Sequence, residues 1–243
     1  MSSPVLSEPP PERVLVVNAD DFGRTPGINA GIMKTHREGI VTSASAMVRW
    51  PAALEAAALA REAPELALGL HVDLKEWVFE DGDWREVYTV VETDDLAVVE
   101  AEVRRQSLRF RDLFGKQPTH LDSHQNVHRW TPAIGELLDR LGEELGVPVR
   151  QRNGRVAFDG SFYGQALKGD PMHEAISVEH LSEKIRALPP GITELSCHPG
   201  LGDDFDSPYR SERHIEVDTL CDDRIRKTIE EEGVQLRSFA EIK

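Results

Sequence analysis

The sequence predicts an α/β fold with mostly parallel strands, and two observations lead to that prediction. Short apolar runs alternate with stretches of helical periodicity along most of the chain, which is the pattern of strands joined by crossover helices. Four of the apolar runs also end in carboxylate or imidazole side chains, at the position where α/β folds assemble their sites. These runs are VLVVNADD from Val14, LALGLHVD from Leu66, PTHLDSHQNVH from Pro118 and ITELSCHPG from Ile192.

Length, composition and charge narrow the class of protein. A chain of 243 residues that is 40% hydrophobic can bury one large core, so we expect residues 13–243 to form a single domain. Residues 1–12 are expected to be a disordered lead, because their prolines cannot supply backbone donors. The net charge of −15 disfavours nucleic acid as a partner, and no apolar stretch is long enough for a membrane span. Without a signal-peptide pattern at the N-terminus, we expect a soluble, cytoplasmic protein.

The first part of the chain predicts the order strand, helix, strand, helix, strand. Thr25 and Pro26 supply a cap and an N-terminal proline for the first helix, and Gly39 is placed to end it. β-Branched residues then favour a strand, and an alanine-rich stretch favours a second helix. The expected elements are a strand at 14–17, a helix from 26 to about 38, a strand at 40–48, a helix at 51–64 and a strand at 66–72.

The rest of the chain is expected to continue this alternation around two irregular segments. Residues 75–95 hold four aromatic residues among acidic residues and glycines, and they predict a loop excursion at the rim of a site. Residues 153–175 contain four glycines and predict a second irregular stretch. The other expected elements are helices at 95–114, 132–145, 178–187 and 216–232, strands at 118–123, 146–152 and 192–198, and a short apolar segment at 234–236.

Asp20 and Asp21 follow the first apolar run and are candidate metal ligands. Two like charges at the mouth of a low-dielectric core repel each other unless a cation or a proton lies between them. The alternative is a capping role, in which either carboxylate accepts backbone N–H groups of the turn before Thr25. Two adjacent aspartates after a buried strand favour the metal interpretation.

Histidines supply the other candidate ligands. Strand alternation in THLDSHQ puts His120, Asp122 and His124 on one face, which therefore holds two imidazoles and a carboxylate. His71 lies in an apolar run, where a core histidine bonded to a carbonyl would be ordinary. It is a candidate ligand only because His120, Asp122 and His124 are expected beside it. His128 is expected just past the strand end, beside the ligands.

This set of ligands predicts metal-assisted hydrolysis. Imidazole and carboxylate together suit zinc, manganese, cobalt or nickel, whereas magnesium prefers oxygen alone. One aspartate with two histidines would leave coordination positions for water, and an open site of this kind produces a nucleophile near neutral pH. His198 is a further titratable group at a strand end and is available as a general acid. A hydrogen-bonded histidine before a proline turn is the alternative for that residue.

Four motifs together resemble the YdjC-like carbohydrate deacetylases, the family that includes chitooligosaccharide deacetylase and a related enzyme of hopanoid biosynthesis. NADDFG, LGLHVDL, PTHLDSHQNVH and CHPG occur in the family's order and spacing, and the resemblance runs from about Arg13 to the carboxyl end. It includes FYG at 162–164 and the closing RIRKTIEEEGVQLRSF. The resemblance implies a distorted, seven-stranded TIM-like (β/α)7 barrel that uses a divalent metal to remove acetyl groups from N-acetylated sugars or oligosaccharides.

The resemblance also implies roles for the matched residues. Asp21, His71 and His124 are similar to the family's metal-binding residues. Asp20 is similar to its catalytic base, and His198 to the histidine that protonates the leaving amine. Such proteins are usually described with magnesium, whereas the ligand chemistry above favours a softer ion. A homodimer is expected by analogy alone.

One position departs from the family pattern. Where members often read DSHHHVH or DSHQHVH, this chain has Asn126. If that position serves only as a partner beside the ligands, asparagine can still form hydrogen bonds there, and metal binding is not obviously lost. The effect on rate or on substrate choice is open.

Two other classes of function stay open. A metal-dependent hydrolase of another bond, such as a phosphoester, could use the same ligands, but phosphate substrates call for Arg or Lys beside the metal. Arg150 and Arg152 are the candidates for that role. A non-catalytic sugar-binding protein is the other class, with Asn126 as the hint of lost activity. The joint presence of all five candidate site residues argues against it.

Overall fold

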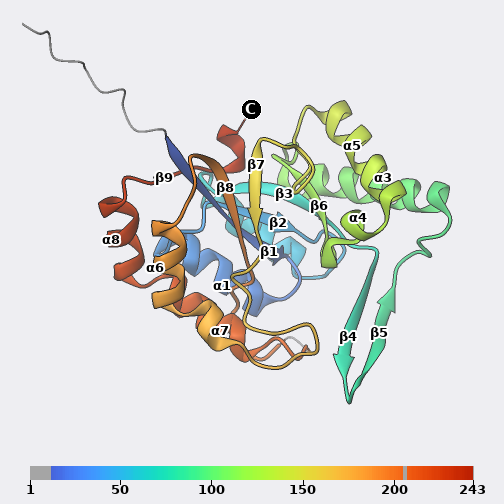
Figure 1. The fold of residues 1–243 in the computed structure, drawn as a ribbon. Helices are drawn as coiled ribbons and strands as arrows, with labels where there is room; N and C mark the ends of the chain where they lie inside the picture. The colour runs from blue at the N-terminus through green and yellow to red at the C-terminus, as the bar shows by residue number, and fades with distance from the viewer. Residues whose placement is uncertain (1–11, 205–206, 243) are drawn as a thin grey trace, which may run out of the picture.

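A curled sheet of seven strands lies at the centre of the computed structural model, which describes residues 12–204 and 207–242 (Figure 1). The strands are β1 (Arg13–Phe22), β2 (Ser43–Ala46), β3 (Ala67–Val72), β6 (Leu121–Ser123), β7 (Val156–Asp159), β8 (Gly191–Cys197) and β9 (Gln235–Leu236). Every pairing in this sheet is parallel, in the order β6-β3-β2-β1-β8-β7, and β9 pairs with the first part of β1. In the described ranges no ladder joins β6 to β7, so the curl is an open barrel. The α/β class expected from the sequence is confirmed.

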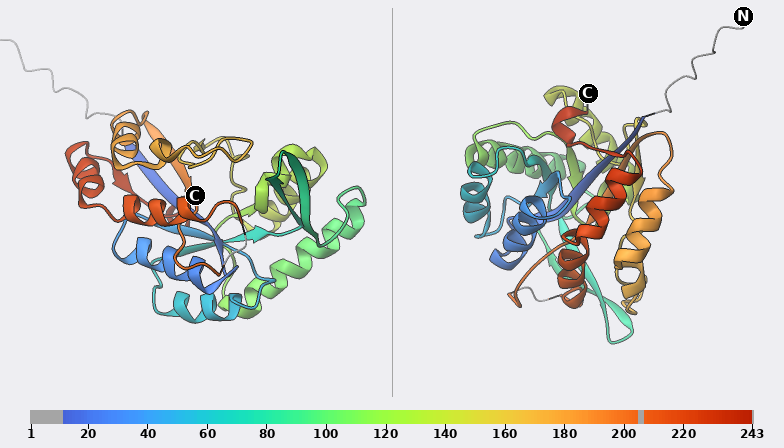
Figure 2. Two further views of the ribbon diagram at one scale, coloured as in Figure 1. Left: turned by 90° about the horizontal axis from the view of Figure 1, so that it is seen from below. Right: turned by 90° about the vertical axis from the view of Figure 1, so that its left-hand side faces the viewer.

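Helices cover the outer side of the curled sheet (Figures 1 and 2). They are α1 (Pro26–Arg37), α2 (Ala53–Arg61), α3 (Leu96–Phe114), α4 (Val127–Trp130), α5 (Pro132–Leu145), α6 (Val178–Arg186), α7 (Ser211–Leu220) and α8 (Asp223–Glu231), with single 3₁₀ turns η1 (His124–Asn126), η2 (His173–Ile176) and η3 (Phe239–Glu241). One buried hydrophobic cluster joins them to the sheet through residues such as Leu15, Ile32, Leu68 and Phe110. Among the residues described, no helix is long and apolar enough to cross a membrane.

Capping residues place several helix ends where the sequence predicts them. The Thr25 hydroxyl accepts a hydrogen bond from a backbone N–H of the first turn of α1, and the Asp95 carboxylate does the same for α3. Gly115 ends α3 with φ 67°, in the left-handed region that glycine adopts readily. The helices expected from 26, at 95–114, at 132–145 and at 178–187 are therefore confirmed to within about a residue of their predicted ends.

The segment 75–95, expected to be an irregular loop, contains an antiparallel hairpin instead. Its strands are β4 (Lys75–Glu80) and β5 (Asp83–Thr89). The turn between them is Asp81 and Gly82, with φ values of 53° and 86°. Two positive φ values at Asp-Gly are typical of the tight turn that joins hairpin strands, so this dipeptide was the overlooked signal. The hairpin projects from the barrel at the end of the sheet where β3 leaves it (Figure 1).

The strand expected at 146–152 is wrong, and the segment 153–175 is not wholly irregular. Val149 makes a single bridge to Leu121, and no ladder extends from it. Pro148 has no N–H to donate, and Gln151 adopts φ 64°, which ends extended pairing. β8 pairs with β1 on one side and with β7 on the other, and β7 lies inside the segment expected to be irregular.

The helix expected at 216–232 is two helices, because a cap interrupts it. α7 begins earlier, at Ser211, and ends at Leu220. The Asp222 carboxylate then accepts a hydrogen bond from the backbone N–H of Arg224 and starts α8 in a new direction.

The strand expected at 118–123 is also shorter and covers Leu121–Ser123. Apart from Glu12, the expected disordered lead lies outside the described residues.

Gly69 of β3 is required by the packing of the sheet against His120. A Cβ atom on Gly69 would lie 2.2 Å from Nε2 of His120, whose ring is buried and packs 4.2 Å from the ring of Phe239. We predict that Gly69→Ala lowers the free energy of unfolding by about 1–3 kcal/mol, measured by urea denaturation, because the ring cannot move aside. In a His120→Ala background the same substitution should cost much less. An equal cost in both backgrounds would contradict this explanation.

Candidate functional site

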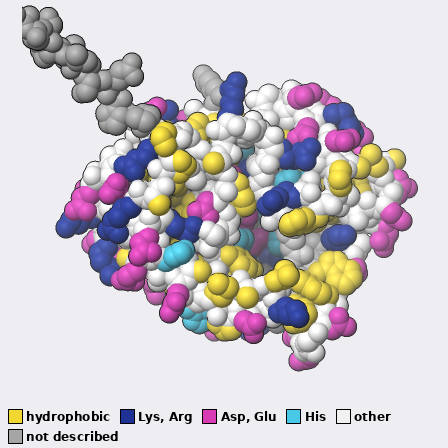
Figure 3. Space-filling model, in the orientation of Figure 1, with side chains coloured by type: hydrophobic (Ala, Val, Ile, Leu, Met, Phe, Trp, Pro, Cys, Tyr) yellow, Lys and Arg dark blue, Asp and Glu magenta, His cyan; other side chains and the backbone are white. Residues whose placement is uncertain are grey.

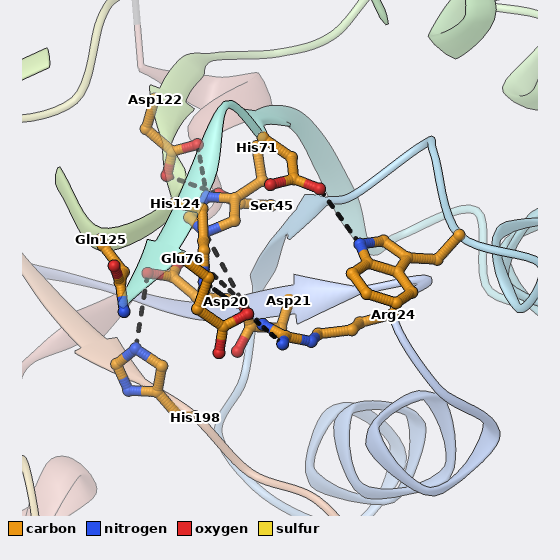
Figure 4. Close-up of polar contacts among 12 residues, drawn as sticks. Asp20, Asp21, Arg24, Ser45, His71, Glu76, Asp122, His124, Gln125 and His198 are labelled. Carbon is orange, nitrogen blue, oxygen red and sulfur yellow. Dashed lines mark hydrogen bonds and ion pairs between the residues drawn. The ribbon is translucent and has the colours of Figure 1, made fainter. Parts of the chain in front are cut away.

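Five of the residues singled out in the sequence converge at the carboxyl ends of the strands (Figure 4). Asp20 and Asp21 end β1, His71 lies near the end of β3, His124 follows β6, and His198 follows β8. All five line one cleft with a volume of about 800 Å³. Asp21 has φ 74°, an uncommon backbone conformation for an aspartate, and it interrupts the regular pairing of β1 with β2.

Asp21, His71 and His124 form a cluster that could hold a metal ion. Oδ1 of Asp21 lies 3.2 Å from Nδ1 of His124 and 3.6 Å from Nε2 of His71, and the three ligand atoms lie within 4.8 Å of one another. Ligand bonds of about 2.0–2.2 Å would place neighbouring ligand atoms about 3.0–3.5 Å apart. Oδ1 of Asp21 is buried and has no hydrogen-bond partner within residues 12–204 and 207–242. The site therefore fits a cation bound by one carboxylate and two imidazoles.

His71 presents a lone pair to that cluster. Its Nδ1 lies 2.9 Å from Oδ1 of Asp122, and because a carboxylate only accepts, Nδ1 holds the proton. Burial lowers the pKa of His71 to about 4, so the ring is neutral at neutral pH and Nε2 is unprotonated. A lone pair that faces the carboxylate of Asp21 is unfavourable unless a cation lies between them. The Asp122–His71 pair is the arrangement that usually orients a metal-binding histidine.

His124 is bordered on its other side by a charged pair that the sequence did not indicate. Nε2 of His124 lies 3.2 Å from Nη1 of Arg24 and 3.7 Å from Oε2 of Glu76, and these two residues form a buried ion pair with each other. Burial alone would lower the pKa of His124, but the facing carboxylates of Asp21 and Glu76 raise it to about 9. Glu76 belongs to β4, so the hairpin contributes directly to the site.

Asp20 is held by Arg150, which is fully buried. Nη1 of Arg150 donates to Oδ1 of Asp20 at 2.7 Å, Nε donates to Glu194 at 2.6 Å, and a further ion pair joins Arg150 to Asp122. Burial alone would raise the pKa of Asp20, but the Arg150 guanidinium outweighs it, and the pKa falls to about 2. Asp20 is thus ionised at neutral pH, and its Oδ2 lies 3.7 Å from Nε2 of His198.

Hydrogen bonds to its backbone and an aromatic contact with its ring hold His198 in place. Its N–H donates to Glu216, and its carbonyl accepts from Nη1 of Arg213 at 3.1 Å. Nη2 of the same arginine lies 2.5 Å from Oδ2 of Asp21, so Arg213 joins His198 to the cluster of Asp21, His71 and His124. The ring of Tyr163 meets the imidazole edge to face at 5.4 Å. Burial lowers the pKa of His198 to about 4.

The other sequence candidates surround this cluster at different depths. His120 contacts Oγ of Ser45 at 3.0 Å, and the same hydroxyl donates to Asp122 at 2.9 Å, so His120 and Asp122 do share one face. His128 is buried between Ser123 and the carbonyl of Arg150 and does not line the cleft. Asn126 lines the cleft with φ 54°, and its Oδ1 accepts from Nε2 of Gln151 at 2.6 Å.

Sequence reasoning missed five residues that set the charge of this site: Arg24, Glu76, Glu194, Arg213 and Glu216. A glutamate inside an apolar strand, as in ITELSC, was the one signal available for Glu194. Arg24 directly follows the NADDFG motif and could have been considered with it. The remaining three come from a hairpin interpreted as a loop and from a helix whose start was misplaced.

Sequence comparison finds relatives along nearly the whole chain. A family model described as YdjC-like protein matches residues 14–231. The chitooligosaccharide deacetylase of Serratia marcescens is 33% identical over 265 aligned residues, which cover 95% of this chain and 100% of that protein. The protein of the same name from Citrobacter koseri is 34% identical over 261 aligned residues, with the same coverage of 95% and 100%.

Structural comparison agrees with this assignment. A protein from Enterococcus faecalis V583, described as a candidate cellobiose-phosphate cleavage protein, superposes with a TM-score of 0.75 at 26% identity, covering 94% of this chain and 98% of that one. A family 4 carbohydrate esterase from Streptomyces lividans has a TM-score of 0.56 at 12% identity, covering 93% and 92%, which shows a shared fold. Because the family model spans most of the chain and relatives above 30% identity cover nearly all of it, the protein belongs to the YdjC-like family.

Proposed function

We propose that the protein is a metal-dependent hydrolase that removes the acetyl group from an N-acetylated sugar. The observation on which this depends is the convergence of Asp21, His71 and His124, with an unpaired buried oxygen of Asp21 between two imidazoles. Asp20 and His198 stand beside that cluster in the same cleft, as the acid and base of an amide hydrolysis would. The relatives named as chitooligosaccharide deacetylases support the choice of bond and of substrate class.

Asp21, His71 and His124 would hold one divalent ion. When bound, such an ion supplies Lewis-acid polarisation of the acetamide carbonyl and an acidic water. The donor set of one carboxylate and two imidazoles favours zinc, manganese, cobalt or nickel over magnesium. Arg213 occupies Oδ2 of Asp21, so this carboxylate would contribute Oδ1 alone.

Asp20 is the proposed base, and His198 the group that protonates the leaving amine. A carboxylate with a pKa of about 2 is a weak base, so it needs an acidic water, which is the chemistry that the bound ion supplies. His198 is neutral before the reaction because burial lowers its pKa to about 4. The proton taken up by Asp20 would pass to Nε2 of His198, 3.7 Å away, and then to the amine nitrogen as the C–N bond breaks.

The phosphoester alternative finds little support in the charges of the site. Arg150 faces three carboxylates, those of Asp20, Asp122 and Glu194. Arg152 pairs with Asp139 on the surface, at 2.5–2.9 Å. The two arginines that the sequence offered for a phosphate group are therefore neutralised by acidic partners. A non-catalytic role is opposed by the close convergence of all five candidate residues.

We predict that Asp20→Asn leaves the metal bound and abolishes turnover, because Asp20 contributes the base and no ligand atom. Metal content is measured by elemental analysis and acetate release with a panel of N-acetylated sugars. His71→Ala is the matched variant and should lose the metal and the activity together. Parallel loss of metal and activity in Asp20→Asn would make this residue a ligand and contradict its assignment as the base.

We predict that Arg150→Met destabilises the fold by about 3–5 kcal/mol, because it leaves three buried carboxylates without their cation. The matched Arg152→Met variant breaks a surface pair and should cost about 0–1 kcal/mol. Both are measured by urea denaturation at neutral pH.

The pH dependence of these variants follows from the pKa of Asp20. In the native protein this pKa is lowered from 3.8 to about 2, so the ionised carboxylate stabilises the fold above pH 3.8, and the contribution is lost as the pH falls through 2. Without Arg150 the lowering disappears, and the deficit of Arg150→Met should shrink in acid. A deficit equal to that of Arg152→Met at every pH would show that the cluster is not held by Arg150.

We predict that Glu76→Gln weakens metal binding by about 10–100-fold, measured by calorimetric titration with Zn²⁺ and Mn²⁺. If Nδ1 of His124 is a ligand, its Nε2 bears a proton that Glu76, the nearest carboxylate at 3.7 Å, would accept, whereas Arg24 at 3.2 Å can only donate and would have to turn away from Nε2. The double variant Arg24→Met/Glu76→Gln separates this role from the ion pair with Arg24. Affinity should stay low in the double variant. Full recovery there would mean that Glu76 only balances the charge of Arg24.

A further inference from the structure

The β4–β5 hairpin presents an aromatic face at the mouth of the cleft. Phe79 and Trp84 are paired directly across its two strands, with ring centroids 5.5 Å apart. Trp77 precedes Phe79 by two residues and therefore lies on the same face. Trp77 is 37% exposed and Trp84 is 48% exposed. All three residues line the cleft that contains Asp20 and Asp21. Figure 3 shows hydrophobic side chains gathered beside the central hollow on this side of the molecule.

Folding alone gives no reason for this face. A two-stranded hairpin has no core of its own, and exposed tryptophans on it gain little by burial within the fold. The hairpin is held by the other face of β4, where Glu76 and Val78 are buried, and by polar contacts near its base. Gln125 accepts from the backbone N–H of Trp77 at 3.0 Å and donates to its carbonyl at 2.7 Å. Because Gln125 directly follows His124, the aromatic face stands in a fixed position relative to the proposed metal site.

The shape and charge of the cleft indicate what this face contacts. Its volume of about 800 Å³ lies in the upper part of the range of about 300–1,000 Å³ that small-molecule sites occupy, so one acetylated ring at Asp20 would leave its outer part empty. Among the described lining residues outside the catalytic cluster and the charged residues beside it (Arg24, Glu76 and Arg213), Arg129 is the one charged group. Its guanidinium lies 5.2 Å from the ring of Trp130. The outer cleft therefore suits an uncharged, partly apolar group.

We propose that the aromatic face formed by Trp77, Phe79 and Trp84 binds the sugar ring next to the acetylated one. This assignment rests on the function proposed above and takes its oligosaccharide class from the relatives named chitooligosaccharide deacetylase; the second ring is uncharged. The C–H face of a pyranose ring offers a flat apolar surface to an aromatic ring, while its hydroxyl groups at the edge stay hydrated. Because the aromatic face lines the same cleft as Asp20 and His198, a ring bound there can belong to the same substrate molecule as the acetylated ring.

The kinetic test compares substrates of increasing length. Acetate release is measured with N-acetylated disaccharide, trisaccharide and tetrasaccharide for the wild type, Trp77→Ala and Trp84→Ala. Each variant should raise KM roughly 2–10-fold, the range expected for loss of one stacked ring, with kcat at saturation nearly unchanged. Val87→Ala on β5 is the control, because Val87 is 39% exposed and does not line the cleft. Trp84→Phe keeps a ring and should recover most of the affinity. Unchanged KM values in both alanine variants would overturn the proposal.

A binding measurement separates this proposal from the proposed function. The Asp20→Asn protein, alone and combined with Trp77→Ala or Trp84→Ala, is titrated with the same oligosaccharides by calorimetry. Binding that weakens in the tryptophan variants supports the subsite even if the wild type releases no acetate, in which case only the proposed reaction fails. Oligosaccharide binding that is absent, or independent of both tryptophans, overturns the subsite. A tryptophan-dependent dimer in sedimentation, or tryptophan-dependent binding to lipid vesicles, with unchanged oligosaccharide affinity, would assign the face to that partner instead.

Discussion

The organisation of the site depends on one buried carboxylate. Asp21 has one oxygen bound by Arg213, while the other faces nitrogen atoms of His71 and His124 at 3.6 and 3.2 Å and accepts no hydrogen bond. In a low-dielectric interior such an oxygen is costly unless a cation or a proton compensates it. Without a metal, the compensating proton lies on His124, whose pKa is raised to about 9, because the Nδ1–H of His71 is directed to Asp122. A metal ion would satisfy all three groups at once.

The residues around Asp21 have two roles: some orient the histidines, and others compensate the charge of the aspartates. Asp122 orients His71, and Glu76 lies beside the outer nitrogen of His124. Arg150 keeps the neighbouring Asp20 ionised, and Arg213 contacts both Asp21 and the backbone of His198. Charged residues from the barrel, the hairpin and α7 thus meet in one network, in which each buried charge has an opposite partner. Removing Arg24, Arg150 or Arg213 would therefore leave at least one buried carboxylate without its cation.

Much of this arrangement could be predicted from local sequence signals, and the rest could not. Apolar runs ending in Asp20, His71 and His198 predicted the strand ends, because a parallel sheet brings such ends to one edge. The hairpin and the strand at 156–159 escaped prediction. The Asp81-Gly82 turn was a readable signal for the hairpin, whereas a strand of four residues such as Val156–Asp159 gives too short a pattern to identify. Partners such as Arg213 come from distant helices, and only the tertiary fold brings them to the site.

Anomalous X-ray diffraction from crystals soaked with Mn²⁺ or Zn²⁺ would test whether Asp21, His71 and His124 together bind one metal ion. We expect one strong peak between Asp21, His71 and His124, at about 2.0–2.2 Å from Oδ1 of the aspartate and from the facing nitrogen of each imidazole. If the three side chains are ordered and no peak lies among them, or if the only peak lies elsewhere on the protein, these residues do not form the metal site.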